Sequence, residues 1–381
     1  MKKNVWLEAT HLVSKRGQNK TGVGYYTANI IESVISLDKT NNYSIFANLF
    51  VTSKVKLPFS RKLFRLSRAI PGKFWNQMIK KHLMPPMEYV FRSRPDVVVF
   101  FNFVKLPTLR TTKVITVVHD LAFVHYPEFV DRKNQKYLSA FVGPSLEESD
   151  HVVAVSEATK RDVIKTFAIQ SERISVVPNA VDHNKFKRVE TSKEIAHHYQ
   201  LPERYILFVG TIEPRKDLPT LIEAHKMLPI DIRKNYPLVI AGMNGWVEEL
   251  NDEVARYCQT GEAILTGYID GDDLPEIYSG ASLFVLPSVF EGFGIPLLEA
   301  MACGVPVIGA DNSSIPEVVG SAGLLFQTGN KADLADKMKK ILMSKSIANS
   351  LIDKGYAQSK KYTWENSAKE LIKVINRLPN L

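Results

Sequence analysis

Short apolar stretches alternate with helical patterns along the whole chain. In the first half, the strand-like stretches are residues 4–9, 43–50, 96–101, 113–118 and 150–155. In the second half, they are residues 205–209, 238–241, 263–265, 283–286 and 305–309. Strands that are apolar almost throughout, and that are joined by helices, indicate parallel sheets with both faces covered.

Helical spacing of apolar residues is clearest near the start of the chain. Residues 21–37 predict a helix with one apolar face, formed by Tyr26, Ile30, Val34 and Leu37. Further helices are predicted after residues 150–155, with Ser156 as the N-cap, and over residues 218–227. The pattern predicts an α/β protein with two doubly wound domains that face each other across a cleft. Ligands of such sheets bind at the carboxyl ends of the strands.

The length of 381 residues fits about two domains of ordinary size. A polar, charged stretch between about 178 and 202 separates two strand-rich blocks. We therefore predict a first domain over residues 1–180 and a second domain over residues 181–363. A C-terminal helix at about 364–381 is expected to pack back on the first domain.

The composition excludes several classes of protein. Apolar residues make up 45% of the chain and charged residues 23%, which is typical of a folded globular protein and not of a disordered or fibrous one. No apolar run reaches the roughly 18–20 residues that span a bilayer, and the start of the chain does not resemble a signal peptide. We therefore expect a cytoplasmic protein. The two cysteines, Cys258 and Cys303, are too few for a disulfide framework or a zinc cluster.

The net charge of +9 comes from one segment of the chain. Residues 54–94 contain eleven Lys or Arg and a single acid, Glu88, whereas the remaining residues hold 38 bases and 39 acids. Apolar side chains are interleaved with the basic ones over residues 56–83. A basic amphipathic segment of this kind predicts contact with an anionic membrane surface. The alternatives are a solvated helical face or an acceptor-binding segment, and no module for nucleic acid is recognisable.

The segment that carries most chemical information is residues 288–308. A loop with Gly292 and Gly294 follows a predicted strand and leads into a helix with Pro296 near its first position. Unpaired N–H groups at such a helix start form an anion site. Glu291 precedes this helix, and we expect Glu299 in its first turn. Carboxylates accept hydrogen bonds from sugar hydroxyls, so a phosphate between two such acids indicates a nucleotide sugar. The alternative is a capped helix with two solvated acids.

This segment resembles the retaining glycosyltransferase family four, whose members have the GT-B fold. The family pattern is E-G-F-G-x-P-x-x-E-A-M-A-x-G-x-P-V. The chain matches it at Glu291, Gly292, Phe293, Gly294, Pro296, Glu299, Ala300, Met301, Ala302, Gly304, Pro306 and Val307. The resemblance implies that Glu291 binds hydroxyls of the transferred sugar and Glu299 those of the ribose. It also implies that the donor lies against Gly292, Phe293, Gly294, Ile295, Pro296 and Leu297.

Two cations follow the first strand of the second domain. Arg215 and Lys216 lie where the donor phosphates are expected, and they supply the positive charge that a departing diphosphate needs. The family often has an Arg directly after the glycine of this strand, where this chain has Thr211 after Gly210. An Arg-Lys pair after a turn can also be solvated surface.

Three weaker signals complete the predicted site. His119 ends an apolar strand, and in the family a histidine at this place contacts the donor sugar, although a single histidine can be structural; His125 is a weaker candidate. Gly22 and Gly24 stand before the first helix and would bring N–H groups near the donor or acceptor. Tyr268 lies where the family holds the nucleotide base, mostly through backbone groups.

The resemblance implies a retaining hexosyltransferase of polysaccharide biosynthesis. We expect mannose to move from GDP-mannose to a hydroxyl of a glycan or lipid-linked acceptor, with no cofactor and no metal. The sequence Asp270-Gly-Asp272, with Asp273, is expected to begin a helix and not to bind a metal. We expect a peripheral location on the inner face of the plasma membrane. Alternatives are an epimerase or phosphorylase of the same fold, and an inactive GT-B scaffold that serves as a membrane adaptor.

Overall fold

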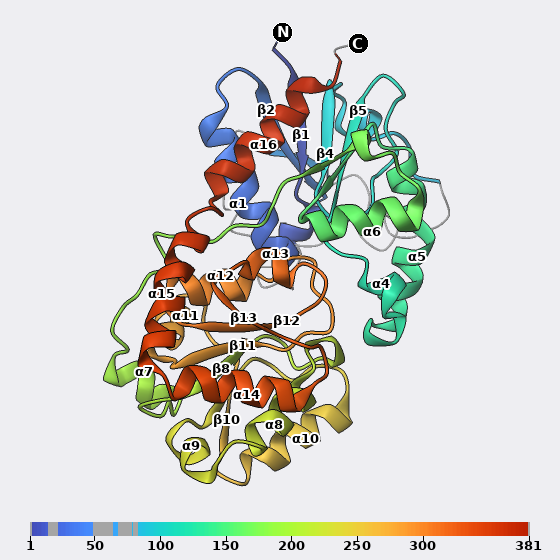
Figure 1. Ribbon diagram of the computed structural model, residues 1–381. Coiled ribbons are helices and arrows are strands. Elements are labelled where there is room, and N and C mark those ends of the chain that lie inside the picture. The colour runs from blue at the N-terminus through green and yellow to red at the C-terminus, as the bar shows by residue number, and fades with distance from the viewer. Residues whose placement is uncertain (1, 14–21, 49–63, 68–77, 79–82, 380–381) are drawn as a thin grey trace. The chain divides into compact units, whose positions relative to one another are not determined.

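The computed structural model describes residues 2–13, 22–48, 64–67, 78 and 83–379 (Figure 1). The chain forms two compact units. The first unit comprises Met1–His125, Val130–Asn179 and Trp364–Leu381, and the second comprises Tyr126–Phe129 and Ala180–Thr363.

Residues 126–129 differ from the expectation that all of residues 1–180 form one domain. They group with the second unit, where the ring of Tyr126 lies 5.6 Å from that of Phe290 and 5.7 Å from that of Phe129. Aromatic packing of this kind depends on residues distant in sequence, so the strand and helix pattern gives no indication of it.

The first unit is built on a parallel sheet that has seven strands among the described residues, in the order β3-β2-β1-β4-β5-β6-β7. The strands are β1 (Asn4–Glu8), β2 (Asn42–Asn48), β3 (Phe64–Ser67), β4 (Val97–Phe100), β5 (Lys113–Val118), β6 (His151–Ala154) and β7 (Ile174–Val176). The β4 side chains are all buried, as are those of β5 after its first residue. Burial on both faces explains why these strands are apolar almost throughout.

The helices of the first unit cover this sheet. They are α1 (Gly22–Leu37), α3 (Met87–Phe91), α4 (Ala122–His125), α5 (Arg132–Glu147), α6 (Glu157–Phe167) and α16 (Trp364–Arg377). Tyr26, Ile30 and Val34 of α1 are buried as predicted, whereas Leu37 is 39% exposed because α1 ends there and the chain turns into β2. Ser156 caps α6 as predicted, since its hydroxyl accepts a hydrogen bond from the Thr159 N–H at 3.0 Å.

The second unit contains a parallel sheet of six strands in the described part of the chain, in the order β10-β9-β8-β11-β12-β13. The strands are β8 (Ile206–Val209), β9 (Leu238–Ala241), β10 (Ala263–Gly267), β11 (Leu283–Leu286), β12 (Val307–Ala310) and β13 (Gly323–Phe326). Counted from β8, this is the 3-2-1-4-5-6 order of dinucleotide-binding sheets, whose direction of winding reverses between the first and fourth strands. Ligands of such sheets bind where β8 and β11 end.

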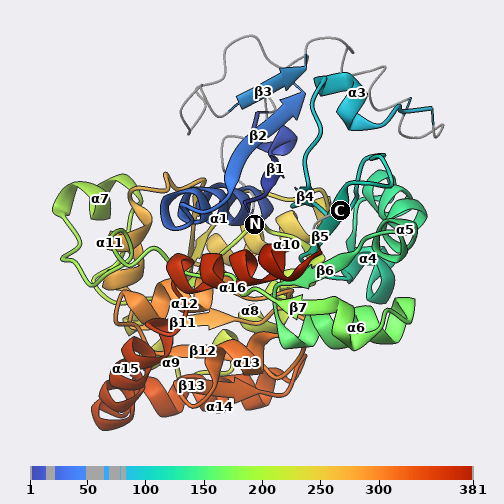
Figure 2. The ribbon, with the colours of Figure 1, turned by 90° about the horizontal axis from the view of Figure 1, so that it is seen from above.

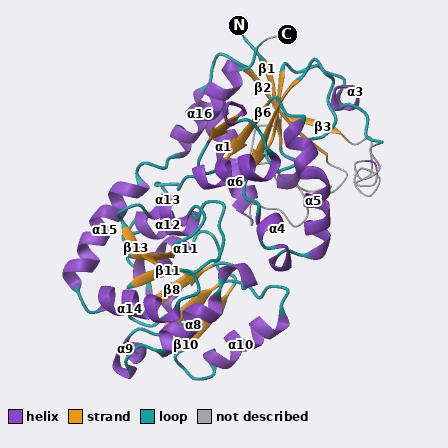
Figure 3. Ribbon diagram, turned by 45° about the vertical axis from the view of Figure 1, so that its right-hand side comes forward, coloured by secondary structure: helices purple, strands orange, loops and turns teal. Residues whose placement is uncertain are grey.

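Helices lie on both faces of the second sheet (Figure 3). They are α7 (Lys193–His198), α8 (Leu218–Lys226), α9 (Ile230–Asn235), α10 (Glu248–Cys258), α11 (Leu274–Gly280), α12 (Ile295–Ala302), α13 (Ile315–Val319), α14 (Lys331–Leu342) and α15 (Lys345–Ser359). The helix expected after Asp270, Asp272 and Asp273 is α11, although the Asp273 side chain makes no capping hydrogen bond.

Most of the basic segment 54–94 lies outside the described residues. Its described parts include the strand β3 at the edge of the first sheet, the helix α3 beside it, and Leu83 (Figure 2). Residues 64–67 are therefore strand, and the alternative of a solvated helical face does not hold for them. In the described part of the chain, no helix combines the length and the apolar character that crossing a bilayer requires.

Candidate donor-binding site of the second unit

The candidate site forms where β8 and β11 end side by side. β8 leads into the 3-10 helix Pro214–Lys216, which presents the two predicted cations, and β11 leads into the loop that carries Glu291. The two segments are joined by a backbone hydrogen bond from the Val289 N–H to the Arg215 carbonyl, at 2.9 Å. The sheet order therefore brings together residues that are 76 positions apart in the sequence.

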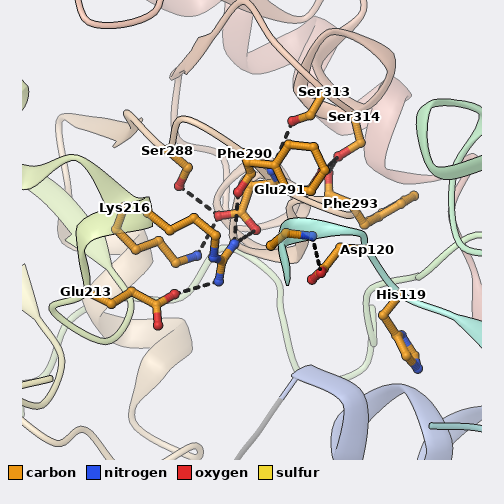
Figure 4. Close-up of polar contacts among 12 residues, drawn as sticks. His119, Asp120, Glu213, Lys216, Ser288, Phe290, Glu291, Phe293, Ser313 and Ser314 are labelled. Carbon is orange, nitrogen blue, oxygen red and sulfur yellow. Dashed lines mark hydrogen bonds and ion pairs between the residues drawn. The ribbon is translucent and has the colours of Figure 1, made fainter. Parts of the chain in front are cut away.

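The Glu291 carboxylate is held by three side chains. Its Oε1 accepts hydrogen bonds from Lys216 Nζ at 2.6 Å and from Ser288 Oγ at 2.7 Å, and its Oε2 accepts one from Arg215 Nη1 at 2.9 Å. Figure 4 shows Lys216 and Ser288 converging on this carboxylate. Glu291 and Lys216 are each 9% exposed. Three of the predicted catalytic residues thus form one connected cluster.

Arg215 connects a second acid to this cluster. Its Nη2 donates to Glu213 Oε1 at 2.6 Å, and its Nη1 also donates to the Phe290 carbonyl at 2.9 Å. Glu213, Arg215, Lys216 and Glu291 together carry no net charge. An incoming diphosphate must therefore compete with two carboxylates for the two cations.

Burial and charge act in opposite directions on Glu291. Burial alone raises the pKa of this carboxyl, but the positive charges of Lys216 and Arg215, together with hydrogen bonds from Lys216 and Ser288, outweigh it and hold the pKa at about 2. Glu291 is therefore ionised at neutral pH. Three of its roughly four acceptor positions are occupied, which leaves one for a ligand hydroxyl.

The start of α12 has the geometry of an anion site. Gly294 is its N-cap with a φ of +103°, a conformation that favours glycine, and Pro296 occupies one of the first two helical positions. Ser314 Oγ donates to the carbonyls of Glu291 and Phe293, both at 2.9 Å. These bonds fix the loop before α12. Pro296 has no N–H and the Leu297 N–H donates to the Gly294 carbonyl at 3.0 Å, so the Ile295 N–H is the donor that the first turn offers to a ligand.

Several predicted donor-binding residues can contribute only their backbone. The Phe293 side chain is 3% exposed and its ring lies 5.5 Å from that of Tyr362, at a steep angle. Gly292 and Leu297 are buried as well, whereas Ile295 is half-buried. Any contact of Gly292 and Phe293 with the donor therefore reduces to backbone groups, whereas the side chain of Ile295 stays partly accessible.

Glu299 is in a different environment from Glu291, and its predicted place in the first turn is wrong. The helix begins at Ile295, so Glu299 lies in the second turn, one position beyond the first four residues. Its Oε2 accepts a hydrogen bond from the Tyr278 hydroxyl of α11 at 2.8 Å. Burial raises the pKa of Glu299 to about 7, against smaller opposing effects of Tyr278 and of the positive charge of Lys185. The two acids of the motif thus have pKa values pushed in opposite directions.

The remaining predicted residues of this unit lie along the same edge of the sheet. Gly210 and Thr211 directly follow β8, and Thr211 is exposed. The Ile212 N–H donates to the Met243 carbonyl at 3.0 Å, which fixes this loop against the one after β9. Tyr268 directly follows β10 and is 47% exposed.

The predicted residues of the first unit follow β1 and β5. His119 comes after the last residue of β5, is 7% exposed, and its Nε2 lies 2.7 Å from the Phe101 carbonyl oxygen. Its neighbour Asp120 accepts a hydrogen bond from the Ala122 N–H at 3.0 Å (Figure 4). Gly22 and Gly24 lie in the first turn of α1, and a Cβ added at Gly22 meets nothing within 4 Å. His125 lies 3.6 Å from Asp162, at the end of α4.

Sequence reasoning missed the side chains that support Glu291. Ser288 stands three positions before it and could have been noticed within the motif, and Glu213 lies two positions before Arg215. Ser313, whose hydroxyl accepts a hydrogen bond from the Glu291 N–H at 2.9 Å, and Ser314 come from the loop after β12. That loop is more than twenty residues away in sequence, and no local pattern indicates the contact.

Comparison with known proteins identifies the family. The model of "Glycosyl transferases group 1" matches residues 191–358, and the model of "Glycosyltransferase Family 4" matches residues 42–185. The O-antigen chain mannosyltransferase B of Escherichia coli is 33% identical over 266 residues, which cover 69% of this chain and 70% of that protein. The chain belongs to glycosyltransferase family 4.

A further relative agrees with this assignment, and a solved structure shows the fold. The serotype-specific mannosyltransferase WbdA of Escherichia coli is 32% identical over 70% of this chain, which spans only 34% of that longer protein. The sucrose-phosphate synthase of Thermosynechococcus elongatus matches 99% of both chains with a TM-score of 0.74 at 18% identity, so that this likeness shows the fold alone. This glycosyltransferase has the predicted GT-B fold. The comparisons support neither an epimerase nor an inactive adaptor.

Proposed function

We propose that this family 4 glycosyltransferase transfers mannose from GDP-mannose to a hydroxyl of a glycan or lipid-linked acceptor in polysaccharide biosynthesis, with retention of the anomeric configuration. The observation that carries the proposal is the cluster of Arg215, Lys216 and Glu291 at the ends of β8 and β11, beside the start of α12. The E. coli relative is an O-antigen chain mannosyltransferase, which supports mannose as the sugar.

The roles of the residues follow from their chemistry. Breaking the bond between sugar and phosphate creates negative charge on the diphosphate. Arg215, Lys216 and the Ile295 N–H at the start of α12 would stabilise this charge. Glu291 would accept a hydrogen bond from a hydroxyl of the transferred sugar, and Glu299 would accept hydrogen bonds from the ribose hydroxyls. Tyr268 would face the base, and His119 would contact the transferred sugar.

The state of Glu291 supports reaction on one face of the sugar. Retaining glycosidases use a carboxylate nucleophile. Both oxygens of Glu291 are bound by cations or a hydroxyl, and its low pKa of about 2 makes it a weak base and a weak nucleophile. We propose that the leaving phosphate oxygen accepts the proton of the acceptor hydroxyl while that hydroxyl attacks, with no residue of the chain as nucleophile and no metal required.

A panel of donors tests this function. The protein is heated with GDP, UDP, GDP-mannose or UDP-glucose, and GDP-mannose is expected to raise the unfolding temperature most, because binding to the folded state alone stabilises it. With an oligosaccharide acceptor, nuclear magnetic resonance of the product is expected to show an α-linked mannose. Protection by UDP-glucose alone contradicts mannose as the sugar, and a β-linked product contradicts retention.

We also propose that residues 54–94 bind an anionic membrane surface, with a peripheral location on the inner face of the plasma membrane. Two apolar side chains in the described part of this segment support contact with lipid, since Leu83 is 65% and Tyr89 is 61% exposed. Arg92 and Arg94 lie three and five positions after Tyr89. Each basic residue near an anionic surface contributes about 1 kcal/mol.

Sedimentation with vesicles tests the membrane proposal. Binding to phosphatidylserine-containing vesicles is expected at low salt and is expected to fall at high salt and in the double variant Arg92→Glu, Arg94→Glu. The double variant Lys226→Glu, Lys331→Glu changes the net charge equally on the second unit and serves as the control. Absent binding, or equal loss in both variants, contradicts the proposal.

A further inference from the structure

His119 is held by groups of the first unit on several sides. A carbonyl oxygen only accepts hydrogen bonds, so the 2.7 Å contact with Phe101 places a hydrogen on His119 Nε2. In the neutral ring, Nδ1 is then the acceptor. The rings of Tyr26 and Phe103 meet the imidazole edge-on, with centroids 5.1 Å and 5.4 Å away. These contacts define both the tautomer and the plane of the ring.

Tyr26 contributes to this arrangement through its ring and not through its hydroxyl. The side chain is fully buried, and its hydroxyl makes no hydrogen bond to a described residue. Burial raises the pKa of Tyr26 well above its ordinary value, so the phenol stays neutral. The ring packs between His119 and the indole of Trp364, whose centroid is 5.8 Å away at an angle of 67°.

Trp364 begins α16, which runs alongside α1 (Figures 1 and 2). It is 7% exposed and its ring also lies 5.7 Å from that of Tyr25. Ser367 Oγ donates to the Pro178 carbonyl at 2.8 Å near the start of the helix. At its end, Lys3 Nζ donates to the Ile375 carbonyl at 2.7 Å. The last helix is thus fixed to the first unit at both ends.

We propose that Trp364 is a positioning residue for His119, and that α16 supports the predicted sugar-contacting histidine from the far end of the chain. The Trp364 ring packs against the ring of Tyr26, and the Tyr26 ring in turn fixes the plane of the His119 imidazole. The Phe101 carbonyl fixes the tautomer of this imidazole. The inference rests on the proposed function in so far as His119 contacts the transferred sugar. The contacts themselves lie within one unit and involve no donor.

Three substitutions in α16 test this role. Trp364→Ala removes the ring that supports Tyr26, Trp364→Phe keeps an aromatic ring there, and Leu371→Ala removes a fully buried side chain of the same helix that is not among the aromatic contacts. Both alanine variants are expected to lower the unfolding temperature, since each leaves a cavity. Only Trp364→Ala is expected to change the orientation of the His119 ring.

The decisive readout is the nitrogen–proton spectrum of the His119 ring, assigned with a His119→Gln variant and recorded without donor. We expect the wild type to show the Nε2-protonated form, Trp364→Ala to show shifted or broadened His119 signals, and Trp364→Phe to restore them. With GDP-mannose, Trp364→Ala is expected to lower kcat about tenfold while KM for the donor changes less than about twofold. Wild-type His119 signals in Trp364→Ala, or the same change in Leu371→Ala, overturn the inference. Failure of the wild type to use GDP-mannose would instead contradict the proposed function and leave the spectra interpretable.

Discussion

Lys216 Nζ lies 2.6 Å from Glu291 Oε1, and this buried ion pair joins the loop after β8 to the loop after β11. The ion pair therefore lies where the strand order of the second sheet reverses its direction of winding. With Arg215 at 2.9 Å on the other oxygen, the pair fixes the carboxylate beside the start of α12.

The ion pairs of Glu291 are expected to make stability depend on pH in acid. A folded-state pKa of about 2, lowered from 4.5, means that the stabilisation is fully present above about pH 4.5 and is lost as the pH falls toward 2. The shift corresponds to about 3 kcal/mol. Urea unfolding between pH 2.5 and 7 is expected to show this loss in the wild type and not in Glu291→Gln. If the free energy of unfolding varies with pH in the same way in both proteins, the lowered pKa of Glu291 is contradicted.

Removing Arg215 or Glu299 is expected to lower turnover by orders of magnitude without unfolding the protein. Arg215→Ala and Glu299→Ala should each lower kcat about 100-fold or more, because stabilisation of the leaving diphosphate or binding of the ribose is lost. Arg233→Ala is a matched control, since Arg233 is 20% exposed, like Arg215 at 19%, and pairs with Glu262 at 3.1 Å. Near-normal transfer by both site variants would refute their roles.

Glu299 is expected to destabilise the folded protein above neutral pH. Its folded-state pKa of about 7 exceeds the ordinary value of 4.5, so stability declines as the pH rises from about 4.5 to 7 and is constant beyond. Glu299→Gln should therefore gain about 3 kcal/mol at pH 8 and almost nothing at pH 4. Denaturant titrations at the two pH values measure the difference. A gain of equal size at both would show that burial of the charge is not its cause.

Neutralising Glu213 is expected to strengthen the binding of a diphosphate. Glu213→Gln keeps a side chain that can accept from Arg215, but it changes the net charge of the four-residue cluster from zero to +1. We expect GDP to bind several-fold more tightly at low salt, with the gain reduced at high salt. Calorimetric titration measures the affinity. Weaker binding in this variant would show that Glu213 positions Arg215 and does not compete for it.

A side chain at Gly294 is expected to weaken the binding of the donor. At a φ of +103°, alanine costs about 1–2 kcal/mol, and its Cβ would lie 3.3 Å from Leu297 Cδ1. Gly329→Ala has the same backbone cost at a φ of +74° with nothing within 4 Å. The two variants should lose similar stability, whereas only Gly294→Ala should also bind GDP more weakly. Equal GDP affinity in both variants would contradict binding of the donor at the start of α12.

Most of the apolar strands could be predicted because their side chains are almost all buried, on both faces of the sheet; β10, in which only Ala263 is buried, is an exception. The predicted strands correspond to β1, β2, β4, β5, β6 and β8 to β12, with ends that match or differ by one or two residues where these are described. The strands β3, β7 and β13 were missed. β3 lies within the basic segment, β7 has three residues of which only Ile174 is buried, and β13 has a buried side chain only at Phe326. A run of three or four residues is too short for its periodicity to distinguish a strand from part of a helix.

The residue types of the candidate site could be predicted, but their ionic partners could not. The glutamate motif is local, and the sheet order brings Lys216 and Arg215 to it. The neutralising acid Glu213, the supporting Ser288 and the opposite pKa directions of Glu291 and Glu299 depend on burial and on contacts between distant loops. Burial in three dimensions decides these properties, and a linear pattern does not encode it.

A crystal structure with GDP tests the central claim most directly. We predict that the diphosphate lies against the N–H groups of Gly294 and Ile295, with an oxygen within about 3 Å of Lys216 Nζ or of the Arg215 guanidinium, and with the ribose at Glu299. GDP bound elsewhere, or an unoccupied loop at saturating GDP, would contradict the account.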